Sequence, residues 1–239
     1  MFVLGFSFLG AFIGMSSWGW GAVFPILALL ITGQPLHIAV GTNRIASLGK
    51  FFTSIPLLFK TGLIRPKLVC VLILVSSLWS FVGAFLAVHI SKESFRYLII
   101  VLLFAALVLY ICRPAFWTQS SKSRKVGLLY YFLGDVYAGI FTAGAWIIRN
   151  MWLVYWKWLT LLEAMANNRI PSFVAAIVSA SVFWRAWYFD LVYMVAVFLW
   201  TAVGGYLGTK LAITRGSGFI RYMGILALLI TLVYVIFVT

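Results

Sequence analysis

The chain has 239 residues, of which 64% are hydrophobic and only 9% are charged, and its mean hydropathy is +1.10. Soluble domains carry about 45–50% apolar and about 25% charged residues, which excludes a soluble fold. The 18 lysines and arginines outnumber four acids, but they lie singly between apolar runs and form no basic stripe, which excludes nucleic acid as a partner. The composition predicts an integral membrane protein that contacts lipid.

Eight sustained apolar runs follow one another along the chain. Most have about 20 residues or slightly more, the length that an α-helix needs to cross about 30 Å of hydrocarbon. The least apolar connector between them is the basic segment 114–125. We therefore predict an all-α polytopic membrane protein. The runs cover residues 2–31, 36–59, 66–89, 95–113, 126–156, 158–184, 189–211 and 219–238.

The sequence contains an internal repeat. A shift of 125 residues aligns residues 1–114 with 126–239 without a gap, and 21 of the 114 positions are identical. Chance rarely keeps polar pairs in register inside apolar segments, so we predict two homologous transmembrane halves, 1–113 and 126–239, joined by the linker 114–125. The most informative matches are Gly14 with Gly139, Gly19 with Gly144, Asn43-Arg44-Ile45 with Asn168-Arg169-Ile170, Ser47 with Ser172, and Gly83 with Gly208.

The distribution of cations favours an inverted repeat. If all eight runs cross the membrane, the lysines and arginines of the loops divide 8 to 6 between the two sides, which is hardly a bias. If runs 2–31 and 126–156 instead turn back at their glycines, each half crosses an odd number of times and the division becomes 11 to 3. Cytoplasmic loops are enriched in Lys and Arg. We therefore predict inverted halves, re-entrant or half-helix segments at 2–31 and 126–156, and both termini outside.

The first run is poorly suited to a continuous helix. Its residues 14–25 read GMSSWGWGAVFP, in which three glycines and Pro25 weaken helical structure. Interrupted segments at matching positions of two halves mark the binding site in many transporters. Close helix packing through small residues is the alternative interpretation of the same glycines.

Polar residues form a stripe on one helix of each half. At 100° per residue, Asn43, Ser47, Lys50 and Ser54 share one helix face, and the second half repeats this pattern with Ala175 in place of the lysine. Such a stripe is expected to face the other half or a cavity rather than lipid. Hydrogen bonds between helices would also explain the Asn and Ser residues. The repeated residues are Asn168, Ser172 and Ser179.

Four cations lie within the predicted membrane segments: Arg44, Lys50, Arg149 and Arg169. Each charge at a helix centre costs about 2.5–3.5 kcal/mol, so the four together cost about 10–14 kcal/mol before compensation. Positive charge beside the N-termini of broken helices is what an anion site requires. The alternative is internal pairing of the arginines with an acid or with backbone carbonyls.

The order of the motifs resembles the sulfite exporter TauE/SafE family of bacterial and archaeal transporters, over nearly the whole chain. The first-half motifs that carry the resemblance are Gly14, Gly19, Gly21, Pro25, Ala39, Gly41-Thr42-Asn43 and Gly62. Those of the second half are Tyr137 through Gly144, Ala166-Asn167-Asn168, Gly204-Gly205 and Gly208. The resemblance implies a gradient-driven secondary transporter in a prokaryotic cell membrane, which exports sulfite or a related sulfur-containing or organic anion such as a sulfonate.

The chain departs from the family pattern near the expected site. Three adjacent glycines of the family are replaced by Trp18-Gly19-Trp20-Gly21, the second half has Ala145-Trp146, and Ala138 stands where an acid is common. Because these changes bring indole rings near the site, the substrate need not be sulfite itself.

These observations define the residues expected to bind and couple. Intramembrane ionisable groups are the usual proton relays, so a coupling proton or ion is expected to use Glu163, Asp135 or His37. No cofactor or metal is expected, since the sequence lacks nucleotide motifs and pairs neither Cys70 nor Cys112 with a second ligand. The expected substrate-binding residues are Asn43, Arg44, Ser47, Asn168, Arg169, Ser172, Gly19, Gly21 and Gly144.

Three other functions stay open at this point, and so does the oligomeric state. A passive anion channel would share the basic interior but lack alternating access. An intramembrane enzyme is disfavoured: GMSSWG at 14–19 loosely matches a rhomboid serine motif, but His37 and His89 are the only histidine bases available and both lie at segment ends. A structural membrane subunit without cargo is the third.

Overall fold

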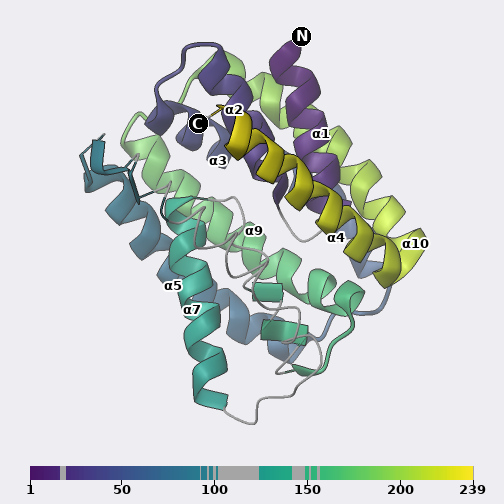
Figure 1. Cartoon of the computed structure of the whole chain (residues 1–239). Helices are drawn as coiled ribbons and strands as arrows, with labels where there is room; N and C mark the ends of the chain where they lie inside the picture. Colours follow the sequence, from purple (N-terminus) through teal and green to yellow (C-terminus); the bar gives the residue numbers. More distant parts are fainter. Residues whose placement is uncertain are drawn as a thin grey trace.

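A computed structural model describes residues 1–16, 20–91, 93–95, 97–98, 101, 124–141, 149–150, 152–154 and 157–238, and the regular structure in these ranges is helical (Figure 1). This confirms the all-α prediction. Two helices in the described part are long and apolar enough to cross a membrane, at Pro66–His89 and Leu191–Ile220. The elements are α1 (Phe2–Ser16), η1 (Trp20–Ala22), α2 (Val23–Ile31), α3 (Leu36–Ala46), α4 (Leu48–Phe59), α5 (Pro66–His89), α7 (Arg124–Ile140), α9 (Leu161–Arg185) and α10 (Leu191–Val238).

The first run is broken where its glycines predicted a break. The 15-residue α1 is about 22 Å long and the nine-residue α2 about 14 Å, so neither spans the hydrocarbon alone. The short turn η1 leads into α2, and the backbone of η1 packs against the backbone of α1. A Cβ on Gly21 would overlap the carbonyl oxygen of Gly10 and lie 2.6 Å from the amide nitrogen of Gly14. Only glycine allows this approach, so the break and the packing depend on the same residue.

The second run, predicted as one segment over 36–59, forms two helices. It divides into α3 and α4 at Ser47, whose backbone stays close to helical (φ −64°, ψ −11°). The matching segment of the second half, α9, is one continuous helix.

Helix α9 begins with a capping box, in which the Thr160 hydroxyl accepts from the amide of Glu163 and the Glu163 carboxylate accepts from the amide of Thr160.

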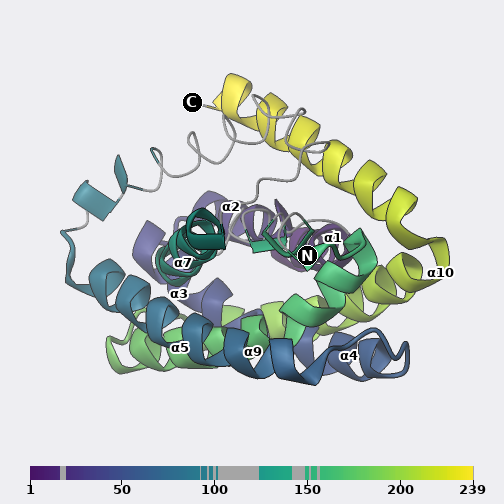
Figure 2. The same cartoon turned by 90° about the horizontal axis from the view of Figure 1, so that it is seen from below.

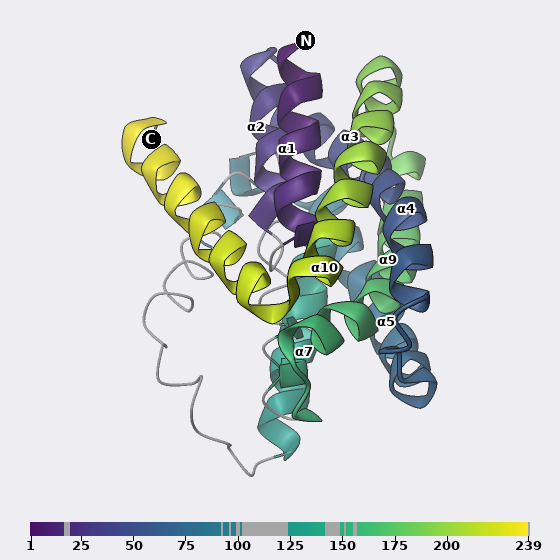
Figure 3. The same ribbon diagram turned by 90° about the vertical axis from the view of Figure 1, so that its right-hand side faces the viewer.

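The helix boundaries follow the 125-residue shift of the sequence. Shifted by 125, α5 becomes residues 191–214, which is the first arm of α10 up to its bend at Gly216 (φ 71°, ψ −166°). The same shift turns α1 into 127–141, close to α7. Figure 3 shows that α1 runs down from its N-terminus whereas α7 runs up. These two matched helices therefore run in opposite directions.

The packing of the helices also pairs elements across the halves. α1 packs against α10, and α7 packs against α5. In the view from below, α1 and α7 lie between the layer of α5, α9 and α4 and the second arm of α10 (Figure 2). Glycines permit both contacts: a Cβ on Gly208 would overlap the carbonyl oxygen of Phe12, and one on Gly83 would overlap that of Val136.

Two equivalent hydrogen bonds hold a loop of one half against a helix of the other. The Thr42 hydroxyl on α3 accepts from the amide of Asp190 (2.9 Å), and the Asn167 amide oxygen on α9 accepts from the amide of Arg65 (2.7 Å). The 125-residue shift converts Thr42 into Asn167 and Arg65 into Asp190. We call these two contacts the helix–loop clamps.

The contact at Gly208 predicts a strong effect of adding one methyl group. In Gly208→Ala the new Cβ meets backbone of α1 that cannot rotate away, so we expect a loss of about 1–3 kcal/mol in stability. Thermal unfolding in detergent measures the effect. Gly218→Ala is the matched control on the same helix, because nothing lies within 4 Å of its Cβ. Equal unfolding temperatures of the two variants would contradict the packing.

Candidate anion-binding site

The polar stripes predicted from the sequence are buried in the protein. On α9, Asn168, Arg169 and Ser179 are completely buried and Ser172 is 3% exposed. On α3 and α4, the corresponding side chains are exposed by 8% or less. Both stripes therefore face the protein interior, as expected. The first-half residues are Asn43, Arg44, Ser47, Lys50 and Ser54.

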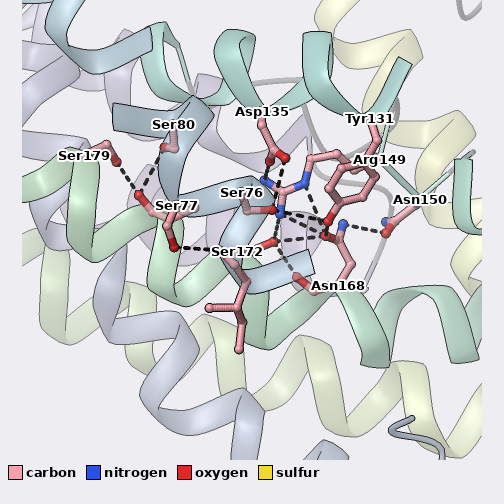
Figure 4. A network of polar contacts seen from close by, with 12 residues as sticks. Ser76, Ser77, Ser80, Tyr131, Asp135, Arg149, Asn150, Asn168, Ser172 and Ser179 are labelled. Carbon is pink, nitrogen blue, oxygen red and sulfur yellow. Dashed lines mark hydrogen bonds and ion pairs between the residues drawn. The ribbon is translucent and has the colours of Figure 1, made fainter. Parts of the chain in front are cut away.

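Arg149 is the centre of a hydrogen-bonded network with the second-half stripe (Figure 4). Its Nη1 lies 2.8 Å from Oδ1 of Asp135 on α7. Its Nε and Nη2 donate to the amide oxygen of Asn168 at 3.2 and 2.9 Å, and Nη2 also donates to the hydroxyl of Ser172. All three guanidinium nitrogens thus have partners. Two of those partners, Asn168 and Ser172, are predicted substrate ligands.

One further helix, α5, contributes to the network around Asp135. On α5, Ser76 donates to Oδ2 of Asp135 at 3.0 Å. The Tyr131 hydroxyl, on the same helix as Asp135, donates to Asn168 at 3.3 Å and lies 3.3 Å from the Ser76 hydroxyl. Asn168 in turn donates to Asn150 at 2.7 Å. A fully buried carboxylate is thereby held by one charged and one neutral donor.

Arg169 connects the second half to the break in the first. Its Nη2 donates to the carbonyl oxygen of Met15 (3.0 Å), and its Nη1 lies 2.8 Å from the Met15 sulfur. Met15 lies in the last turn of α1, where carbonyls lack helical partners and the helix dipole is negative. Arg169 therefore stabilises the C-terminal end of α1, which lies buried in the protein.

The matching residues of the first half are less well satisfied. Nη2 of Arg44 and Nδ2 of Asn43 are buried and have no hydrogen-bond partner in the part of the chain that the structure describes. Arg44 is close enough to Arg149 for their charges to repel, and Lys50 is close enough to both Arg44 and Arg169. The four cations therefore form one cluster, with contributions from both halves.

The cluster has an excess of positive charge. Within the described ranges Asp135 is the one acid that is buried, so four cations and one carboxylate leave three positive charges when all are ionised. Those ranges also contain no group of three or more His, Cys, Asp or Glu residues that could hold a metal. The chemistry that this arrangement suits is binding of a small anion by guanidinium, amide and hydroxyl donors.

The other predicted residues lie elsewhere. Glu163 forms an ion pair with Arg65 at 3.1 Å, at the N-terminal end of α9 where Arg65 is 53% exposed. His37 lies near the start of α3, with its ring 4.7 Å from that of Tyr188. Of the three coupling candidates, Asp135 is the one within the cluster. Gly21 lies at the break, and Gly19 and Gly144 fall outside the described residues.

The site list from the sequence omits several members of the network. The sequence predicts Arg149 as an intramembrane cation, but the 125-residue shift pairs it with Phe24, so the repeat does not indicate it as a binding residue. The position of Arg149 deep within an apolar run is the feature of the sequence that could have indicated it. Nothing in the sequence singled out the remaining members, which are Ser76, Tyr131 and Asn150.

Helices long and apolar enough to cross a membrane, a helix pair broken at glycines and a buried cationic cluster are features of membrane transport proteins. The chain belongs to the sulfite exporter TauE/SafE family, whose model matches residues 1–235. This confirms the resemblance seen in the motifs. Since the family is one of transporters, it also confirms the expectation that the chain is not an enzyme.

A curated relative agrees with this assignment. The chain is 26% identical over 225 residues to a "Probable membrane transporter protein" of Haemophilus influenzae, a match that covers 90% of this chain and 86% of the relative. No solved structure matches the chain.

The buried ion pair predicts unequal effects of two arginine substitutions. Arg149→Gln leaves the Asp135 carboxylate buried without its charge partner, and we expect a loss of about 3–5 kcal/mol in stability. Arg65→Gln breaks the exposed ion pair with Glu163 and should change stability little. Thermal unfolding of the purified variants compares them. A similar unfolding temperature for both would mean that the Asp135–Arg149 pair is not buried in the folded protein.

Proposed function

We propose that the protein is a gradient-driven secondary transporter that exports a small anion, by alternating access around a site between its two halves near the middle of a prokaryotic cell membrane. The proposed cargo is sulfite or a related sulfur-containing or organic anion such as a sulfonate. The observation that carries the proposal is the buried cation cluster, to which the first half contributes Arg44 and Lys50 and the second half Arg149 and Arg169.

The charge balance of the cluster supports an anionic cargo. Each cation at this depth costs about 2.5–3.5 kcal/mol, and Asp135 compensates one of the four. An anion that enters the site compensates more of the remaining charge. The buried donors of Asn43 and Arg44, which lack protein partners among the described residues, are suited to receive its oxygen atoms.

The arrangement of the halves supports alternating access. Matched helices run in opposite directions, and the two helix–loop clamps join the halves through equivalent residues. These features support inverted repeats at 1–113 and 126–239, joined by the linker 114–125, with segments 2–31 and 126–156 re-entering the membrane. In such a transporter the two halves exchange conformations, and the site opens first to one side and then to the other.

Counterflow in sulfite-loaded proteoliposomes tests the function. We expect saturable uptake of labelled sulfite that internal sulfite accelerates, and we expect at least about a tenfold loss in Arg44→Gln/Arg169→Gln, which corresponds to about 1.4 kcal/mol of binding. Arg185→Gln is the matched control, because this exposed arginine lies on the same helix as Arg169.

Three outcomes are informative. Flux without acceleration by internal sulfite would indicate a passive channel. Unchanged flux in the double variant would reject the cluster as the binding site. Absence of exchange in folded wild-type protein would exclude sulfite and direct the same assay to sulfonates.

Cysteine labelling tests the inverted repeat. Lys67 and Thr214 are both exposed, at the start of α5 and near the bend of α10. In a Cys70→Ser/Cys112→Ser background, Lys67→Cys and Thr214→Cys should react with an impermeant maleimide from the same, cytoplasmic side. A parallel repeat of four plain crossings per half requires opposite sides. Labelling from opposite sides would therefore contradict the inversion.

A further inference from the structure

The ion pair between Asp135 and Arg149 has no counterpart in the first half. The 125-residue shift places Gly10 at the position of Asp135 and Phe24 at that of Arg149. The pair therefore breaks the symmetry of the repeat at the site itself. A feature that only one half carries is not part of the scaffold that both halves share.

The two polar stripes differ in the same way. In the second half, Asn168 accepts from Arg149 and donates to Asn150, so both ends of its amide have partners. In the first half, the equivalent Asn43 and the neighbouring Arg44 each have a buried donor atom without a hydrogen-bond partner among the described residues. Of the two equivalent asparagines, the one beside the internal carboxylate thus has both ends of its amide paired, and the other does not.

The carboxylate of Asp135 is bound as a small oxyanion would be. One oxygen lies 2.8 Å from a guanidinium nitrogen and the other accepts from the Ser76 hydroxyl at 3.0 Å. The remaining guanidinium nitrogens of Arg149 contact Asn168 and Ser172, which are neutral. Sulfite, sulfonates and carboxylates all present negatively charged oxygens that a guanidinium binds in the same way, so each can take the place of this carboxylate at Arg149.

We infer that Asp135 is an internal substitute for the transported anion. Its carboxylate occupies an oxyanion subsite at Arg149 when the transporter is empty, and the anion replaces it there when it binds. Arg149 is then a substrate ligand, in addition to Arg44 and Arg169. This inference rests on the proposed function, because it assumes that an anion enters the cluster.

The exchange of partners has a consequence for protons. A buried carboxylate that loses its guanidinium has no charge partner left, so Asp135 takes up one proton and keeps the hydrogen bond from Ser76. The side chains that α5 and α9 place around the pair do not titrate. Tyr131 lies on the same helix as Asp135, and the charge of Arg44 on α3 repels that of Arg149. One anion and one proton therefore enter the site together.

Asp135→Asn tests the inference by removing the internal competitor. Sulfite affinity, measured from the rise in unfolding temperature with sulfite concentration, should increase by about tenfold (about 1.4 kcal/mol) over the wild type. Without sulfite the variant should unfold at a lower temperature, because Arg149 is left uncompensated, and sulfite should restore more stability than in the wild type.

The pH dependence of binding gives a second readout. In the wild type, sulfite affinity should fall as pH rises, because binding requires one proton, and in Asp135→Asn this contribution should be absent. The titration of sulfite itself is common to both proteins and cancels in the comparison. Glu93→Gln, which removes an exposed carboxylate, is the control and should match the wild type.

A milder variant covers the case in which Asp135→Asn does not fold. Ser76→Ala keeps the charge of Asp135 but removes one of its two donors, so sulfite should bind more tightly than in the wild type, by a smaller factor. The inference, but not the proposed function, would be overturned if the variant that folds bound sulfite no more tightly than the wild type and kept the wild-type pH dependence. Failure of wild-type protein to bind sulfite or methanesulfonate would instead reject the proposed function on which it rests.

Discussion

A guanidinium group in hydrocarbon is the constraint on which the rest of this structure depends. Arg149 and Arg169 are both almost completely buried, and each is surrounded by acceptors that different helices supply. Arg169 uses a carbonyl that is available only because α1 ends inside the protein. Arg149 uses a carboxylate, an amide and a hydroxyl from two helices. The broken helix and the cationic cluster therefore stabilise each other.

The break in turn depends on contacts between backbones. Gly21 of η1 lies so close to Gly10 and Gly14 of α1 that no side chain fits at this position. Gly83 and Gly208 bring α7 and α1 equally close to α5 and α10. Helices in lipid gain little from burying apolar surface against one another, and small residues that permit close packing compensate for this. The same glycines that place the helix ends also stabilise the bundle.

The sequence was informative where a pattern repeats or a composition is extreme. Hydropathy predicted the helices, the glycines predicted the break before η1, and the duplicated Asn-Arg pair predicted that Asn168 and Arg169 are buried. The Asp135–Arg149 pair could not be predicted, because it joins segments 14 residues apart without repeat counterparts. The position of Glu163 at the start of α9 and its pairing with Arg65 became evident only from the helix boundary.

The one-sided ion pair bears on what the protein can do when it carries nothing. With Asp135 against Arg149, the empty site has one fewer uncompensated charge to move through the hydrocarbon. Under the proposed alternating access, a transporter whose empty form is stabilised in this way can reorient without cargo. It can then complete a cycle of net movement, whereas a site that an external anion must always fill is restricted to one-for-one exchange.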